Sequence, residues 1–88
     1  MGKQISSSGK TGFLSPDPQV RQRVLAEAGV HERMVRERER QAITGLGRTQ
    51  WWQLERRGLV PKRLPLSCKS RGWRLSDLLY WIDSLGLV

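Results

Sequence analysis

The chain has 88 residues, enough for one domain, and a formal net charge of +8. Its single cysteine, Cys68, allows no internal disulfide and no metal site built from thiolates, and an unpaired thiol suits a reducing cytoplasm. No apolar run is long enough for a membrane span or for the core of a signal peptide. Length and composition therefore argue against a multidomain, disulfide-stabilised or membrane-spanning protein, and we expect a cytoplasmic one.

The positive charge is concentrated in one segment. Between Arg40 and Arg74 the sequence has nine basic residues and one acidic residue, Glu55, whereas bases and acids are equal in number over the rest of the chain. Such a segment is typical of a surface that binds a polyanion such as a nucleic acid. The alternative is a basic face that only keeps the protein soluble.

The N-terminal third is predicted to hold a flexible arm and one accessory helix. Residues 1–15 are rich in Gly, Ser and Lys, as mobile arms are. Residues 16–30 predict a short helix, with Asp17 as its N-cap and Gly29 at its C-terminal end. Its apolar stripe is modest, so three possibilities stay open: it docks on the domain, it contacts a partner, or it forms only on binding.

Residues 31–88 are expected to form the main domain. Met34 and Val35 predict a brief strand, and a helix follows that ends near Ile43, with Gly45 as its left-handed stop. A second helix begins after Gly47 and ends at Gly58. Two helices joined by a tight turn form a helix-turn-helix, whose second helix enters the major groove of DNA.

A hairpin and a final helix complete the predicted domain. Residues 59–75 alternate in the manner of strands on both sides of the polar turn SCKSRG, which gives the hairpin a basic tip. Pro61 and Pro65 lack backbone donors, so the first strand is expected at a sheet edge. The last helix, 76–86, is expected to be capped by Ser76, with Asp77 at its positively polarised end.

The adjacent residues Trp51 and Trp52 must face different environments. Successive side chains on a helix point about 100° apart, so Trp51 shares one face with Leu54. Trp52 falls on the opposite face in a polar stripe spaced i, i+3, i+4, i+7, made up of Thr49, Trp52, Gln53 and Arg56. Amide and guanidinium groups can form paired hydrogen bonds with purine edges. We therefore predict that Trp51 faces the core and Trp52 faces DNA.

The segment AITGLGRTQWWQLERRGLVPKRLPLSCKSRGWRLSDLLYWI closely resembles AlpA-type phage regulators, including excisionase-like proteins. The resemblance covers about half of the chain and rests on residues that match in order and spacing: Thr44, Gly45, Leu46, Trp51, Leu54, Gly58, Pro61, Leu66, Trp73, Arg74, Ser76, Asp77, Trp81 and Ile82. It implies a mainly α fold with a small β-hairpin, a winged helix-turn-helix of the MerR-like and excisionase-like kind. The recognition helix at 48–57 would lie in the major groove, and the basic wing at 62–74 would lie along the backbone.

The chain departs from that family pattern at three positions. Gly47 replaces the usual serine before the recognition helix, and glycine is a tolerable N-cap. Trp52 replaces the usual tyrosine. Arg40 stands where the family tends to have an aliphatic residue; we expect its methylene stem to cover the core while its guanidinium reaches a phosphate.

These considerations give a set of expected roles. The DNA-binding residues are expected to be Arg48, Thr49, Gln50, Trp52, Gln53, Arg56 and Arg57 on the recognition helix, and Lys62, Arg63, Lys69, Ser70, Arg71 and Arg74 on the hairpin. The core is expected to contain Trp51, Leu54, Leu66, Trp73, Leu78, Trp81 and Ile82. We expect no cofactor and no metal.

The functional hypothesis is a sequence-specific protein that binds double-stranded DNA as a prophage-type transcriptional regulator. One alternative is an excisionase-like recombination directionality factor that bends DNA and recruits an integrase. Others are a protein-interaction module and a phage DNA-packaging subunit. RNA polymerase, an integrase or further copies of the chain on DNA are possible partners. Catalysis is not expected, because one histidine, one cysteine and scattered acids offer no catalytic pair, and QISSSGKT lacks the first glycine of a P-loop.

Overall fold

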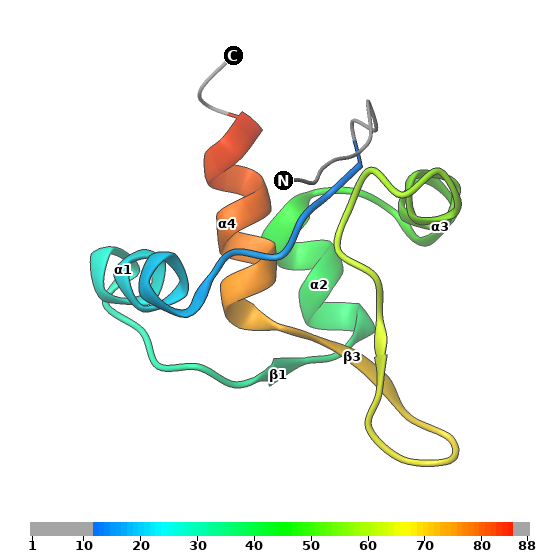
Figure 1. Cartoon of the computed structure of the whole chain (residues 1–88). Coiled ribbons are helices and arrows are strands. Elements are labelled where there is room, and N and C mark those ends of the chain that lie inside the picture. The colour runs from blue at the N-terminus through cyan, green and yellow to red at the C-terminus, as the bar shows by residue number, and fades with distance from the viewer. Residues whose placement is uncertain (1–11, 86–88) are drawn as a thin grey trace, which may run out of the picture.

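A computed structural model of the chain describes residues 12–85, so residues 1–11 of the expected arm lie outside the described residues. The described part contains four helices and three short strands (Figure 1). In chain order they are α1 (Pro18–Ala28), β1 (Met34–Val35), α2 (Glu37–Thr44), α3 (Arg48–Arg56), β2 (Leu64–Pro65), β3 (Arg71–Arg74) and α4 (Leu75–Leu85). The protein is thus mostly helical with a small sheet, as predicted.

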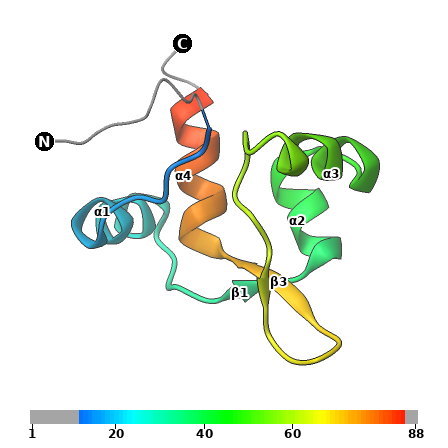
Figure 2. The same ribbon diagram turned by 45° about the vertical axis from the view of Figure 1, so that its right-hand side comes forward.

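The three strands form one antiparallel sheet in the order β1-β3-β2. Val35 pairs with Trp73 on one side of β3, and Leu64 pairs with Gly72 on the other. A Cβ atom at Gly72 would lie 2.8 Å from the carbonyl oxygen of Val35, so only glycine allows β1 to approach this closely. β2, which contains Pro65, lies at the sheet edge as predicted, and the β2–β3 hairpin projects away from the helices (Figures 1 and 2).

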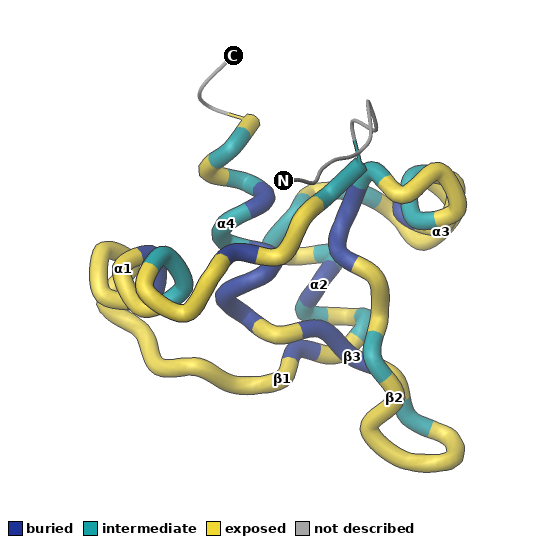
Figure 3. Tube along the Cα trace, viewed as in Figure 1, coloured by how far each residue is buried: buried dark blue, intermediate teal, exposed yellow. Residues whose placement is uncertain are grey.

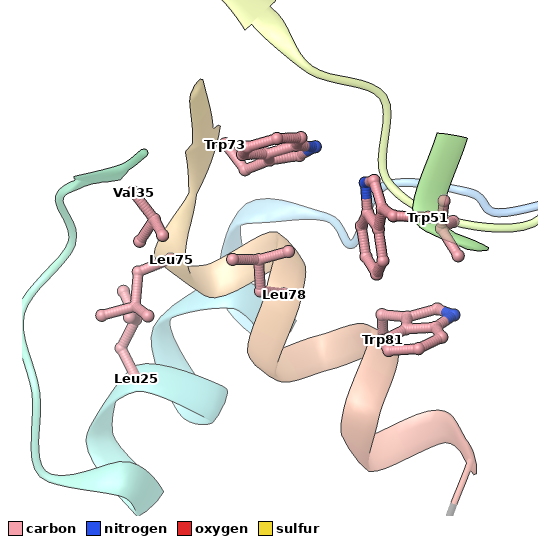
Figure 4. Close-up of a cluster of buried hydrophobic side chains, with 8 residues drawn as sticks. Leu25, Val35, Trp51, Trp73, Leu75, Leu78 and Trp81 are labelled. Carbon is pink, nitrogen blue, oxygen red and sulfur yellow. The ribbon is translucent and has the colours of Figure 1, made fainter. Parts of the chain in front are cut away.

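The core lies where the sheet, α3 and α4 meet. Its centre is a cluster of three tryptophans, in which Trp51 of α3 makes edge-to-face contacts with Trp73 of β3 and Trp81 of α4 (Figure 4). The indole N–H of Trp73 donates to the carbonyl of Pro61 at 3.1 Å, which ties the segment after α3 to the sheet. Trp51, Trp73, Leu78 and Trp81 are buried and Leu54 and Ile82 are partly buried against them, as expected.

Leu66 is the exception among the expected core residues, because it is 38% exposed. β2 ends at Pro65, so Leu66 already belongs to the loop of the hairpin, beyond the part of the sheet that the helices cover. Its side chain instead lies over Gly72 of the facing strand. The predicted strand pattern holds for Leu64, which is partly buried, but β2 ends before Leu66 and leaves that side chain exposed.

The helix α1 docks on α4, which selects one of the three possibilities left open by the sequence (Figure 1). Val24 and Leu25 are buried at this contact. Beside them, Arg21 donates to Asp77 at 2.7 Å and to the hydroxyl of Ser76 at 2.6 Å. Apolar burial and a partly buried ion pair therefore attach the accessory helix to the rest of the protein.

The prediction that Ser76 caps α4 is wrong. β3 continues directly into α4 at Leu75, so Ser76 already lies inside the first helical turn and is fully buried. The carboxylate of Glu32 takes over the capping, since it accepts the backbone N–H of Ser76 at 3.1 Å and its hydroxyl proton at 2.6 Å.

The other helix ends follow the predicted signals. Asp17 accepts the backbone N–H of Val20 at the start of α1. Gly45 ends α2 with a φ of 76°, a left-handed conformation that side chains with a Cβ rarely adopt. Gly58 follows α3 with a φ of 73°. Its carbonyl accepts the N–H of Phe13 at 2.7 Å, so the described end of the N-terminal segment lies against the end of α3.

Arg40 differs most from expectation. Its side chain is 0% exposed, so its guanidinium cannot reach a phosphate. The stem covers the core as expected, but the charged group stays inside the protein and donates to the carbonyl of Leu46 and to the carboxylate of Glu37. These partners lie on its own helix and on the turn that follows, and they offset much of the cost of burying the charge, whereas its buried Nε has no hydrogen-bond partner.

Candidate nucleic-acid interface

The helix α3 has one buried face and one exposed face. Trp51 is 2% exposed and Trp52 is 45% exposed, so the two neighbouring rings point to opposite sides as predicted. The exposed side of α3 also carries Thr49, Gln53 and Arg56, and Figure 3 shows that most residues of this helix are exposed. A hydroxyl, an indole, an amide and a guanidinium therefore occupy one continuous stripe.

Within this stripe, Trp52 and Arg56 interact with each other. The guanidinium carbon of Arg56 lies 4.7 Å from the centroid of the Trp52 ring. One helical turn separates the two residues, so the helix itself places the cation over the ring. This contact restricts the orientation of the guanidinium while its N–H groups stay exposed to a ligand.

The start of α3 presents a further basic side chain. The side chain of Arg48 is 80% exposed, and its Nε lies 4.0 Å from the carboxylate of Glu37. Gln50 is exposed as well, but its side-chain oxygen accepts the backbone N–H of Gly47 at 3.4 Å. Gly47 has no side chain that could cap the helix, so the side-chain oxygen of Gln50 stabilises the start of α3 instead. Only the amide N–H groups of Gln50 therefore remain available to a ligand.

The hairpin carries the second group of expected residues. Lys69 and Arg71 are exposed at its tip, and Lys62, Arg63 and Arg74 are exposed along its base. The side chain of Arg63 lies against α3, where its Nε is 3.4 Å from the carboxylate of Glu55. Ser70 is only half exposed, and its hydroxyl lies 3.3 Å from a guanidinium nitrogen of Arg36. Arg57, at the end of α3, is also exposed.

A groove separates α3 from the hairpin. It has a volume of about 380 Å³ and is lined by Glu37, Arg48, Thr49, Trp51, Trp52, Glu55, Arg63 and Trp73. The expected site residues therefore divide into two ridges, α3 and the hairpin, on either side of one depression. Arg48 and Thr49 border it from the start of α3, and Arg63 borders it from the hairpin side.

Sequence reasoning missed three residues of this surface. Arg36 reaches the hairpin tip through Ser70, and the pairing of Val35 with Trp73, which brings the residue after β1 beside the hairpin, is the signal that could have identified it. Glu37 and Glu55 line the groove, and both pair with arginines there. In the sequence, Glu37 belongs to the alternating charges RERER of residues 36–40, a pattern that indicates only a solvated face, so no local pattern marked it.

Among the described residues, a clear electrostatic perturbation lies outside this surface, at Arg33 and Glu39. The side-chain hydrogen bonds between Arg33 and Glu39 lower the pKa of Glu39 and raise the pKa of Arg33, and both side chains are exposed.

Over residues 12–85 no group of three or more His, Cys, Asp and Glu side chains could hold a metal ion. None of the described helices is long and apolar enough to cross a membrane.

Comparison with known proteins supports the resemblance seen in the sequence. No curated protein and no solved structure matches the chain closely enough to support an assignment. The model of one protein family does match it, under the description "Prophage CP4-57 regulatory protein (AlpA)", over residues 33–85. This range runs from the residue before β1 to the end of α4 and leaves α1 outside. It covers well over half of the sequence, and the chain therefore belongs to the AlpA family of prophage regulatory proteins.

Proposed function

We propose that the protein is a prophage-type transcriptional regulator that binds double-stranded DNA sequence-specifically through α3 and the β2–β3 hairpin. The observation that carries the proposal is the exposed stripe of Thr49, Trp52, Gln53 and Arg56 beside a basic hairpin. The same segment holds the whole excess of positive charge. Membership of a family of regulatory DNA-binding proteins supports the same function.

The dimensions and order of the elements suit insertion of α3 into the major groove. α2, a turn of three residues and α3 follow one another in the order of a helix-turn-helix. An α-helix with its side chains is about 10–12 Å across, which matches the width of about 12 Å of the major groove, and the nine residues of α3 span about 14 Å along the helix axis. The buried face with Trp51 fixes which side of the helix is turned outward.

The exposed side chains divide into groups that read bases and groups that contact the backbone. Gln53 and Arg56 carry an amide and a guanidinium, which form paired hydrogen bonds with adenine and guanine respectively. Lys69 and Arg71 at the hairpin tip would contact phosphates, which positions the protein but carries no sequence information. The remaining basic residues of the hairpin, with Arg48 and Arg57, extend the phosphate-binding surface along both edges of the groove.

The salt dependence of binding tests the proposal. With about four to six phosphates contacted, the logarithm of the affinity should fall with the logarithm of the salt concentration at a slope of roughly −4 to −5. Selection of preferred sites from random duplexes would then give the sequence and the spacing of any repeats. A slope near zero, or the absence of any selected sequence, would contradict the proposal.

The family description favours a regulator over the excisionase-like alternative, because it names a regulatory protein. The two roles differ in what they do to DNA. An architectural factor bends its site strongly, and a bend changes gel mobility with the position of the site in the fragment. For a regulator of the proposed kind we expect little position dependence in a circular-permutation gel. A large position dependence would favour the excisionase-like role.

A further inference from the structure

The buried guanidinium of Arg40 has no part in the direct DNA contacts proposed above. Among residues 12–85 no other arginine or lysine is buried. A cation inside a protein is destabilising unless its partners replace the lost water, and well-packed apolar side chains in place of a whole buried ion pair are often equally stable. Stability alone therefore does not explain why an arginine occupies this position.

The guanidinium links α2 to the turn that precedes α3. Its Nη1 donates to the carbonyl oxygen of Leu46 at 2.6 Å and lies 3.4 Å from the hydroxyl of Thr44. Its Nη2 donates to the carboxylate of Glu37 on the preceding turn of α2. Leu46 lies between the two helices, so the position of its carbonyl fixes how the chain leaves α2 and begins α3.

The same group also contacts the two tryptophans that join α3 to the hairpin. Its central carbon lies 4.8 Å from the ring centroid of Trp51 and 5.6 Å from that of Trp73. Trp51 belongs to α3 and Trp73 to β3, and their rings meet edge to face at 88°. One planar cation therefore contacts the turn, the recognition helix and the central strand of the sheet.

We propose that Arg40 is a positioning residue for sequence recognition, which fixes the angle and distance of α3 relative to the hairpin. The inference rests on the proposed DNA-binding function. Base readout requires donors and acceptors placed within about 0.5 Å, whereas long lysine and arginine side chains reach phosphates from many orientations. Because the hydrogen bonds and ring contacts of a guanidinium are directional, Arg40 specifies a geometry that an apolar side chain of equal size does not.

The substitution Arg40→Met separates positioning from stability. Methionine keeps a long apolar stem but lacks the donors, so the Tm should fall as the carbonyl of Leu46 and the carboxylate of Glu37 lose a partner, and DNA binding is measured on the folded variant. Its preference for the selected site over an unrelated duplex should fall about fivefold or more, because at least one base contact is displaced. The salt slope should stay the same, since no phosphate contact is lost. A residue with a purely structural role would change stability and leave this ratio unchanged.

The matched control is Arg23→Met, which removes one exposed guanidinium from α1 and changes the net charge equally. This variant should keep the wild-type ratio. If Arg40→Met does not fold, Arg40→Lys decides the question by the same ratio, because an ammonium keeps the charge but cannot reproduce the planar, two-sided contacts. A folded Arg40 variant with the wild-type ratio would overturn the inference and leave the proposed function intact. A wild-type chain without any sequence preference would overturn both.

Discussion

The two sides of the molecule use arginine in opposite ways. On the α1–α4 side, Arg21 is 17% exposed in its side chain and contacts Asp77, Ser76 and the carbonyl of Pro16. On the α3 side, Arg48 is 80% exposed in its side chain, and its nearest carboxylate lies at 4.0 Å. The first arginine is engaged within the protein, and the second is largely exposed to solvent.

This difference explains how the net charge of +8 is concentrated on one surface of the protein. Where α1 meets α4, Arg21 is paired with Asp77 at 2.7 Å and lies 3.9 Å from Glu32, so its charge is offset within the protein. On α3 and the hairpin, bases outnumber acids, and both groove carboxylates, Glu37 and Glu55, are already paired with arginines. The charge is therefore concentrated where a polyanion can bind, and association with it should be steered electrostatically.

Trp51 and Trp52 offer the strongest test, because one serves the core and the other the exposed surface. Trp51→Ala removes the ring that joins α3 to Trp73 and Trp81, and should cost about 3–5 kcal/mol of unfolding free energy. Trp52→Ala should leave the protein folded and weaken DNA binding. Urea denaturation followed by circular dichroism, together with DNA titration, measures both. The reverse pattern would contradict the division between the two faces.

Asp77→Asn tests the α1–α4 side of the molecule, where Arg21 is paired with Asp77. The substitution removes the charge that Arg21 binds at 2.7 Å, and should lower the unfolding free energy by about 2 kcal/mol. Because neither Arg21 nor Asp77 makes one of the proposed DNA contacts, the affinity of the folded variant for DNA should change little. Asp83→Asn, at an exposed position of the same helix, is the matched control and should be nearly neutral. Equal destabilisation by both variants would show that the ion pair is not responsible.

Features that depend on neighbouring residues were predictable from the sequence. The helical period alone separated Trp51 from Trp52, and the signals at Asp17 and Gly45 gave the helix ends that the structure shows. The edge position of β2 followed from Pro65, because proline lacks the donor that a central strand needs. Each of these predictions depended on residues within one or two turns of the chain.

Features created by distant residues were not predictable in this way. Glu32 displaces Ser76 as the cap of α4, although the two residues are 44 positions apart. The burial of Arg40 requires ring faces from α3 and β3 together with a carbonyl of the turn. No local pattern indicates such a pocket. The sequence therefore predicted that the stem of Arg40 covers the core while its guanidinium reaches outward to a phosphate. In the candidate site, the missing parts were those that tertiary contacts bring in, such as Arg36 and Glu37.

Gln53 and Lys69 test the division between base reading and backbone contact on the exposed side. Gln53→Ala should relax the preference at one base pair by about 1–3 kcal/mol, because an amide contact to a base edge is lost. Lys69→Ala should weaken binding to all sequences alike and flatten the salt slope by about one. Binding to a panel of single-substitution duplexes at several salt concentrations distinguishes the two. A uniform loss for Gln53→Ala would place that residue on the backbone instead.

The smallest expected effect concerns the exposed pair Arg33 and Glu39, which belongs to neither side. Hydrogen bonds from Arg33 lower the pKa of Glu39 below its ordinary value of 4.5. A carboxylate with a lowered folded pKa stabilises the protein above the unfolded pKa, and this contribution is lost as the pH falls through the folded pKa. Glu39→Gln should therefore lower the Tm slightly at pH 7 and not at pH 3, with Glu27→Gln as an exposed control. Because solvent screens the pair, a Tm decrease as large as that of Asp77→Asn would contradict the distinction between exposed and partly buried ion pairs.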